Sequence, residues 1–175
     1  MTEPLRAPAG SHSLSALTHF MLAHPAHWLA QGFGSGLSPV MPGTAGTLMG
    51  WALFAIPTVL WPAAFTPVFW SVAILVGFAV GIWACDRTGR DMGVADHGSM
   101  VWDEIIAFWL VMLFLMPADF ATQCAAFLWF RFFDMVKPPP IRFFDRHVKG
   151  GFGVMWDDIV AAFYTLMLFA FWRAA

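Results

Sequence analysis

The sequence feature that most constrains the fold is residues 66–85, a run of 20 residues without a charged side chain. A membrane-spanning helix needs about 20 consecutive apolar residues. Over the whole chain, 59% of the residues are hydrophobic and only 11% are charged, whereas ordinary globular proteins carry roughly 25% charged residues. The 175 residues correspond to one domain in length, and one soluble domain does not bury this much apolar surface. The sequence therefore predicts an all-α, polytopic membrane helical bundle.

Other apolar segments raise the expected number of hydrophobic helices to four or five. Besides 66–85, they cover residues 44–61, 105–116, 121–133 and 159–172. Short links between neighbouring segments predict tight turns between antiparallel helices, and Pro57 is expected to kink the first segment. The segments 105–116 and 159–172 are too short to cross a bilayer, because fourteen residues of helix rise only about 21 Å. We therefore expect upstream residues to join both of these helices.

The charged residues are concentrated, since sixteen of the twenty lie in two stretches, 86–104 and 131–158. Antiparallel helices place both stretches on one side of the membrane. Lys and Arg gather on that side, and an excess of these residues in short loops is typical of the cytoplasmic face. We therefore expect the polar face to be cytoplasmic. The nearly uncharged remainder and the net charge of −2 exclude intrinsic disorder and a nucleic-acid-binding protein.

Two similar motifs place an acidic pair beside an apolar helix, Trp102-Asp103-Glu104-Ile105 and Trp156-Asp157-Asp158-Ile159. Helix capping would explain either pair alone. Two such pairs in a chain with so few charges favour a functional site instead. Carboxylates that gather at one interface need cations to neutralise them, and oxygen ligands of this kind suit Mg²⁺ or Mn²⁺ better than zinc. The motifs therefore predict a site for a divalent cation.

Two further segments have features of an anion site. The glycine-rich residues 32–47 precede an apolar helix, where backbone N–H groups are available to phosphate; a plain turn into the membrane is an equal alternative. Three prolines after Lys137 stiffen the next loop and hold Lys137 and Arg142 near the end of a helix. A positively charged anchor loop is the alternative for that segment. Arg131 is expected to snorkel to the interface rather than to take part in catalysis.

The chain is expected to consist of an N-terminal interfacial lead-in, residues 1–31, and a single membrane-embedded domain, residues 32–175. Prolines and a glycine interrupt the first residues, which argues against a cleaved signal peptide. The lead-in holds three histidines among apolar residues, His19, His24 and His27. Because a proline breaks their helical spacing, we favour an interfacial segment over a metal site here.

The order of these motifs resembles the phosphatidylglycerophosphatase A family of bacterial membrane lipid phosphatases. The resemblance covers residues 32–162 and rests on four motifs: Gly-Ser-Gly-x-x-Pro-x-x-Pro-Gly-Thr-x-Gly-Thr at 34–47, Val-Trp-Asp-Glu at 101–104, Phe-Asp-x-x-Lys-Pro-x-Pro-Ile at 133–141, and Gly-Gly-x-x-x-Met-x-Asp-Asp at 150–158. The chain departs from the family at Ala107 and Ala162, where glycine is common, and at Pro139, where an aromatic residue is common. These departures leave the acids, the lysine and the glycine-rich segment in place.

The resemblance implies an all-helical, Mg²⁺-dependent phosphoric monoester hydrolase of the bacterial inner membrane. Its substrate would be a bilayer lipid, phosphatidylglycerophosphate, which it would convert into phosphatidylglycerol and phosphate on the cytoplasmic side. With the residue patterns, we expect the metal ligands to be Asp103, Glu104, Asp157 and Asp158. The expected catalytic residues are Asp134, Asp145 and Lys137. The expected substrate-binding residues are Ser35, Gly36, Thr44, Gly46, Thr47, Arg142 and Arg146.

Two other classes of function stay open at this point, and so does the oligomeric state. A cation or proton carrier is one, because acidic residues within a membrane also mark ion pathways. Its acids should lie in the middle of the bilayer on several helices, whereas these acids cluster at one face. A non-catalytic assembly subunit is the other, and such a protein would tolerate the loss of the acids.

Overall fold

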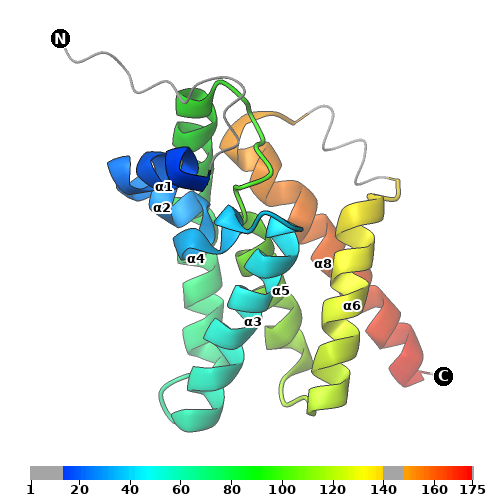
Figure 1. The fold of residues 1–175 in the computed structure, drawn as a ribbon. Coiled ribbons are helices and arrows are strands. Elements are labelled where there is room, and N and C mark those ends of the chain that lie inside the picture. Colours follow the sequence, from blue (N-terminus) through cyan, green and yellow to red (C-terminus); the bar gives the residue numbers. More distant parts are fainter. Residues whose placement is uncertain (1–13, 140–147, 175) are drawn as a thin grey trace.

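The computed structural model of the protein describes residues 14–139 and 148–174. Every regular element in these two ranges is a helix, which confirms the predicted all-α fold. The short 3₁₀ helix η1 connects the N-terminal helices to the bundle (Figure 1). In chain order the elements are α1 (Leu14–Ala23), α2 (Pro25–Ala30), η1 (Gly32–Leu37), α3 (Pro42–Leu60), α4 (Pro67–Met92), α5 (Trp102–Leu115), α6 (Phe120–Val136) and α8 (Gly150–Ala174).

Helix α5 forms the centre of the bundle. Helices α3, α4 and α8 pack against it, and α6 packs against α8 and α5, as Figure 1 shows. The side chains of Ile105, Ile106, Ala107, Phe108 and Val111 in α5 are completely buried. The outer helices instead expose many large apolar side chains. An apolar surface this extensive is typical of a protein that faces lipid.

Three helices are long and apolar enough to cross a membrane, namely α3, α4 and residues Gly150–Arg173 of α8. Helix α5 has 14 residues and α6 has 17, which correspond to about 21 Å and about 26 Å of helix. The expectation that upstream residues join the two short segments is confirmed, since α5 begins at Trp102 and α8 begins at Gly150. Three of the five predicted segments therefore lie in helices that could cross a membrane, and the other two lie in the shorter helices α5 and α6.

Helix α4 continues about two turns beyond Cys85, where its uncharged run ends. Ion pairs between residues one turn apart stabilise such an exposed helical segment. Two of them lie here, each with an N···O distance of 2.8 Å, Arg90–Asp86 and Arg87–Asp91. The first charged residues therefore end the apolar run without ending the helix.

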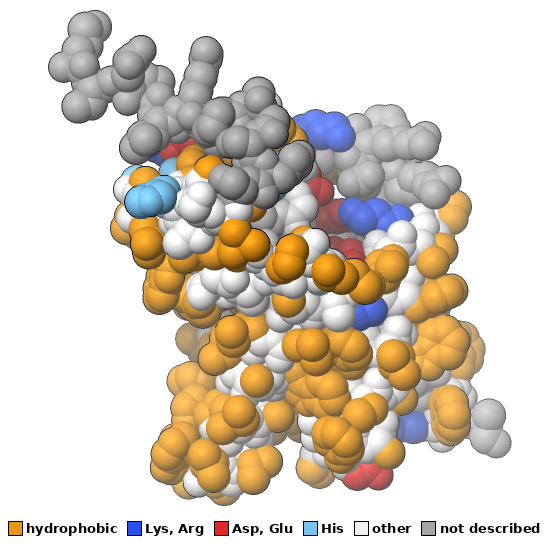
Figure 2. Space-filling model, viewed as in Figure 1, with side chains coloured by type: hydrophobic (Ala, Val, Ile, Leu, Met, Phe, Trp, Pro, Cys, Tyr) orange, Lys and Arg blue, Asp and Glu red, His pale blue; other side chains and the backbone are white. Residues whose placement is uncertain are grey.

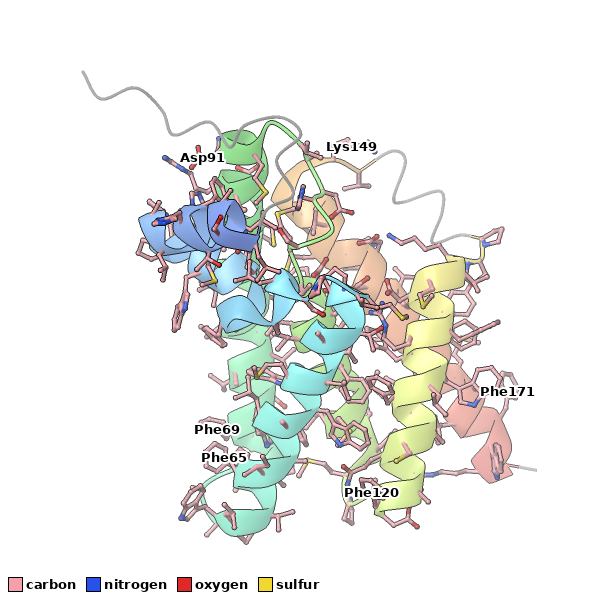
Figure 3. The ribbon with its side chains drawn as sticks, viewed as in Figure 1. Phe65, Phe69, Asp91, Phe120, Lys149 and Phe171 are labelled. Atoms are coloured by element: carbon pink, nitrogen blue, oxygen red, sulfur yellow. The ribbon has the colours of Figure 1, made fainter. Side chains whose placement is uncertain are left out.

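The two ends of the bundle differ in chemistry. Figure 3 shows Asp91 and Lys149 at one end and Phe65, Phe69 and Phe120 at the other. Acidic side chains lie beside Lys and Arg near the first end in Figure 2, whereas hydrophobic side chains cover most of the remaining face. We call the end marked by Asp91 and Lys149 the polar end.

Glycines allow α3 and α5 to approach closely near the polar end. A Cβ atom at Gly46 would lie 2.6 Å from Cβ of Val101, and a Cβ atom at Gly50 would lie 3.0 Å from Cα of Ile105. Any larger residue would therefore push the two helices apart. Small residues at close helix crossings are typical of membrane proteins. This packing holds the first turn of α5 directly against α3.

A buried histidine fixes the N-terminal helices to α4. The Nε2 atom of His27 lies 3.0 Å from Oδ2 of Asp91, and its Nδ1 atom lies 3.0 Å from the carbonyl oxygen of Phe20. His24 caps α2, because its Nδ1 atom accepts a hydrogen bond from the backbone N–H of Ala26. Both histidines therefore contribute to the local structure of the lead-in.

Candidate active site

Three carboxylates converge inside the polar end of the bundle. Asp103 and Glu104 come from the first turn of α5, and Asp158 comes from α8. One oxygen of each residue lies within 4.8 Å of the corresponding oxygens of the other two. We call these three residues the carboxylate cluster. Among the described residues, Oδ1 of Asp103, Oε2 of Glu104 and Oδ2 of Asp158 are buried without a hydrogen-bond partner.

The carboxylate cluster has the chemistry of a cation site. Its three residues are only 7%, 9% and 3% exposed, in chain order. A buried carboxylate oxygen that accepts no hydrogen bond is costly unless a proton or a cation neutralises the group. All the ligand atoms are oxygens, which is the set that Mg²⁺, Mn²⁺ and Ca²⁺ prefer. The residues present therefore fit a hard divalent cation.

Helix capping does not account for this arrangement. The N-cap of α5 is Val101, and its side chain makes no capping hydrogen bond. The dipole of α5 favours acids in its first turn, which covers Asp103 and Glu104. Asp158, in contrast, lies about two turns after Gly150, the first residue of α8, where the dipole effect has faded. The helix dipole thus favours both members of the α5 pair and does not account for Asp158 in α8.

Asp157 faces a different partner from its neighbour Asp158. The ammonium group of Lys137 donates a hydrogen bond to Oδ2 of Asp157. Lys137 ends α6 with a left-handed backbone, at φ 44° and ψ 63°. The side chain of Asp157 is 5% exposed and that of Lys137 is 26% exposed. The structure therefore brings Asp158 into the carboxylate cluster and Asp157 to the predicted catalytic lysine.

Arg131 lies between the carboxylate cluster and α3. Its Nη1 atom is 2.8 Å from Oδ2 of Asp134 and 3.7 Å from Oε1 of Glu104. The same atom donates to the hydroxyl oxygen of Thr47 at 3.3 Å. The arginine side chain is only 12% exposed. The expectation that Arg131 snorkels to the interface is therefore wrong, because three partners on α3, α5 and α6 hold it inside the bundle.

The beginning of α3 brings part of the glycine-rich segment to the site. Gly43 lies so close to Glu104 and Arg131 that a Cβ atom there would force their side-chain ends to move. Thr47 donates a hydrogen bond to the carbonyl oxygen of Gly43 at 2.9 Å while it accepts the one from Arg131. The hydroxyl of Thr44 is buried and has no partner in the described part of the chain.

The rest of the glycine-rich segment has packing contacts. Ser35 donates to the carbonyl oxygen of Gly32 at 2.8 Å. Gly36 lies against the backbone carbonyl of Ser99, where a Cβ atom would collide. Gly46 faces Val101, as described above. Of the predicted phosphate-binding residues in this segment, Thr47 therefore contacts Arg131. Thr44 directly follows Gly43, which lies against Glu104 and Arg131.

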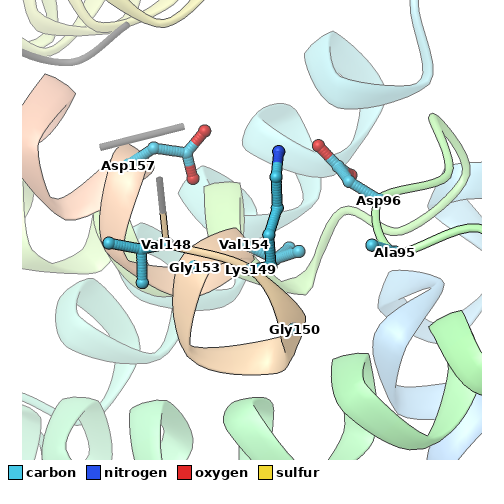
Figure 4. A pocket seen from close by; sticks show the side chains of 8 residues that line it. All are labelled: Ala95, Asp96, Val148, Lys149, Gly150, Gly153, Val154 and Asp157. Carbon is cyan, nitrogen blue, oxygen red and sulfur yellow. The ribbon is translucent and has the colours of Figure 1, made fainter. Parts of the chain in front are cut away.

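A small cavity of about 40 Å³ is lined in part by Asp157 (Figure 4). Asp96 lines it from the loop before α5, and Lys149 lines it from just before α8. In Figure 4 the Lys149 side chain extends between the carboxylates of Asp157 and Asp96. The cavity therefore adds an acid and a base to the charged residues around the site.

The sequence-predicted residues divide into three groups. Asp103, Glu104 and Asp158 come together, and the predicted residues near them are Asp134, Lys137, Asp157, Thr44 and Thr47. Ser35, Gly36 and Gly46 have packing roles. The predicted residues Arg142, Asp145 and Arg146 lie outside the described residues. Residues not predicted for the site are Arg131, Asp96 and Lys149, and their only signal in the sequence is their place within the two charged stretches.

The chain is similar to proteins that are named as phospholipid phosphatases. The sequence profile of the family described as Phosphatidylglycerophosphatase A matches residues 28–173. A phosphatidylglycerophosphatase A from Escherichia coli (strain K12) is 44% identical over 151 residues, which cover 86% of this chain and 84% of that protein. The protein of the same name from Haemophilus influenzae is 41% identical over 152 residues, covering 87% of this chain and 91% of the relative.

A third relative carries a different substrate in its name. This protein from Bacteroides thetaiotaomicron is 40% identical over 147 residues, which cover 81% of this chain and 89% of the relative. It is named, with a qualifier, a phosphatidylinositol-3-phosphatase. No solved structure matches the chain significantly.

Proposed function

Because the chain belongs to the phosphatidylglycerophosphatase A family, we propose that it removes the terminal phosphate of phosphatidylglycerophosphate. The products are phosphatidylglycerol and inorganic phosphate. The observation that carries the proposal is the buried carboxylate cluster at the polar end of an otherwise apolar bundle. A lipid substrate can keep its acyl chains in the bilayer while its headgroup reaches a site at this depth.

The carboxylate cluster would hold Mg²⁺ as the cofactor. Asp103, Glu104 and Asp158 offer it buried oxygens that lack hydrogen-bond partners in the described ranges. When bound, such an ion neutralises charge on phosphate oxygens and lowers the pKa of a bound water. Asp157 stays a predicted further ligand, and its contact with Lys137 suggests a second role, namely to hold that lysine beside the cluster.

The remaining charged and polar groups would bind the phosphate. Lys137 supplies a compact positive charge for the phosphomonoester. The buried hydroxyl of Thr44 is available to donate to a phosphate oxygen. Arg142 and Arg146 are further predicted phosphate ligands. Donors arranged in advance around the phosphate stabilise the charge that develops on its oxygens in the transition state.

Hydrolysis requires a base and a leaving-group proton. A carboxylate, predicted to be Asp134 or Asp145, would accept a proton from the attacking water. The water oxygen then bonds to phosphorus while the bond between phosphorus and the glycerol oxygen breaks. The glycerol oxygen takes up a proton, which the protonated carboxylate can return, and leaves as a hydroxyl. Water and the phosphomonoester are thereby converted into an alcohol and inorganic phosphate, with no covalent enzyme intermediate required.

We infer that the polar end faces the cytoplasm from the bacterial inner membrane. Basic residues that lie at or near this end include Arg87, Arg90, Lys137 and Lys149. Arg173 lies at the opposite end of α8. Such an excess of Lys and Arg supports a cytoplasmic location. The carrier alternative is less favourable because the carboxylate cluster lies at the start of α5 and near the start of α8 rather than along a path between the two ends.

Phosphate release from phosphatidylglycerophosphate by the purified protein in mixed micelles tests the proposal. We expect release with Mg²⁺ and none with EDTA. Asp103→Asn should lose activity, whereas the matched control Asp119→Asn should retain it. Asp119 is exposed and caps α6 at the end opposite the site, and asparagine is an equally good N-cap.

The outcomes separate the alternatives. Release that persists in EDTA, or in Asp103→Asn, would overturn the metal mechanism. No release under any condition would favour a carrier or an assembly subunit. Phosphatidylinositol 3-phosphate as a parallel substrate tests the activity named for the third relative.

A further inference from the structure

Arg131 has a position that the roles proposed above leave unexplained. It lies in α6, and two of its partners lie in other helices, Glu104 in α5 and Thr47 in α3. Its third partner, Asp134, lies one turn further along α6. All three contacts use Nη1, and Nε is buried without a hydrogen-bond partner among the described residues. A side chain kept only for solubility or anchoring would not be enclosed in this way.

Glu104 is the residue through which Arg131 would act. One carboxylate oxygen of Glu104, Oε1, faces the guanidinium at 3.7 Å. The other oxygen, Oε2, is buried and has no hydrogen-bond partner in the described part of the chain. Gly43 closes the side of the pair that faces α3, because a Cβ atom there would run into both side chains. The Glu104 carboxylate thus lies between the Arg131 guanidinium, with which it forms an ion pair, and the backbone of Gly43.

From this geometry we propose that Arg131 is a positioning residue that fixes the Glu104 carboxylate for cation binding. The inference rests on the proposed metal-dependent function. Arginine suits this task because its guanidinium is always protonated and planar, and it holds a carboxylate in a defined direction. The partners of a metal ligand orient it in this way, and their loss commonly reduces metal affinity about 10- to 100-fold.

Positioning and charge balance predict opposite changes in affinity. Replacing Arg131 by an uncharged residue makes the site more negative. If the arginine only balanced charge, the variant would bind a divalent cation more tightly. If the arginine orients Glu104, the variant would bind the cation more weakly in spite of the added negative charge. The sign of the change therefore distinguishes the two roles.

The test measures Mn²⁺ affinity of the purified protein by electron paramagnetic resonance, without substrate. We expect Arg131→Gln to bind about 10- to 100-fold more weakly than wild type. Arg131→Lys, which keeps the charge and loses the planar fork, should recover only part of the affinity. Arg90→Gln serves as the matched control, since Arg90 is 68% exposed on α4 and pairs with Asp86; its affinity should equal that of wild type.

Unchanged or tighter binding by Arg131→Gln, or full recovery by Arg131→Lys, would overturn the inference. Circular dichroism checks that each variant keeps its helical content, and Asp134→Asn provides a second variant that weakens the contact between the guanidinium and α6. A wild-type protein that binds Mn²⁺ and releases no phosphate would overturn the proposed function. The Mn²⁺ affinities of the Arg131 variants would then still decide the positioning role. A wild-type protein that binds no Mn²⁺ would overturn the positioning role and the metal mechanism, and phosphate release would still test the proposed activity separately.

Discussion

The two acidic pairs have nearly the same sequence and different surroundings. Asp103 and Glu104 in α5 each keep one buried oxygen without a hydrogen-bond partner in the described ranges. The same is true of Asp158 in α8, whereas Asp157 accepts a hydrogen bond from Lys137. Three of the four carboxylates therefore share one site, and the fourth, Asp157, binds the ammonium group of Lys137.

The position of each helix explains this difference. Helix α5 is surrounded by other helices, so that both acids in its first turn lie inside the bundle. Helix α8 packs against α5 on one side and α6 on another. Successive side chains on a helix point about 100° apart, and Asp158 and Asp157 are therefore directed to different neighbours. A repeated motif thus predicts a shared location without predicting a shared role.

The largest expected effect separates the two members of the α8 pair. Asp158→Asn should reduce phosphate release on the order of a thousandfold, because it removes a charged oxygen from the carboxylate cluster. Asp157→Asn should reduce it only about tenfold, because it leaves the cluster intact and weakens only the contact with Lys137. Initial rates at saturating Mg²⁺ measure both losses. Equal losses, or a larger loss in Asp157→Asn, would show that the two pairs act alike.

A smaller effect is expected from the lysine that sets Asp157 apart. Lys137→Met should lower phosphate release about a hundredfold and the free energy of unfolding by about 1–3 kcal/mol, since it leaves a buried carboxylate unpaired. Adding Asp157→Asn should restore most of the stability and none of the activity. Denaturation and rate measurements on both single variants and the double variant complete a double-mutant cycle for stability and for activity. Recovery of activity in the double variant would mean that Lys137 serves Asp157 alone.

The α5 pair can be disturbed without changing any charged residue. Gly43→Ala places a methyl group against Glu104 and Arg131, and we expect a loss of about tenfold in the rate of phosphate release. Gly98→Ala is the matched control, since nothing lies within 4 Å of a Cβ atom there. Both rates are measured in the same micelles. Equal rates for the two variants would indicate that the site tolerates displacement of Glu104.

The smallest effect concerns the tryptophans that precede the acids. Trp102 is 6% exposed and donates a hydrogen bond to the carbonyl oxygen of Gly77 at 2.9 Å. Trp156 is only partly buried and stacks on Phe152. Trp102→Phe should therefore lower the free energy of unfolding by about 1 kcal/mol more than Trp156→Phe. Chemical denaturation compares them, and the reverse order would mean that the α8 motif is the more tightly packed of the two.

Much of the fold follows from the sequence, because apolar runs long enough to cross a membrane have few alternatives. The uncharged run at 66–85 predicted one long helix. The segments 105–116 and 159–172 were too short to cross a bilayer, which predicted that upstream residues join those two helices. The extension of α4 was missed, since its ion pairs stabilise a helix that hydropathy alone would end at Cys85. The signal for this extension in the sequence was the spacing of four residues between opposite charges within 86–91.

The candidate site was predictable in part for a similar reason. The repeated acids stand out in a chain with so few charges, and three of them converge. The inward position of Arg131 was not predictable, because its partners Glu104 and Thr47 lie 27 and 84 residues away in the sequence. A single charge near a helix end looks the same in a sequence whether it points to solvent or into a bundle.

Mn²⁺ binding to the two α8 variants tests the central claim most directly. Purified wild type and Asp157→Asn should both bind Mn²⁺ in electron paramagnetic resonance titrations, with affinities within about tenfold of each other. Asp158→Asn should lose this binding, because one of the three converging carboxylates is gone. Binding by Asp158→Asn that equals wild type would contradict the assignment of Asp103, Glu104 and Asp158 as the metal site.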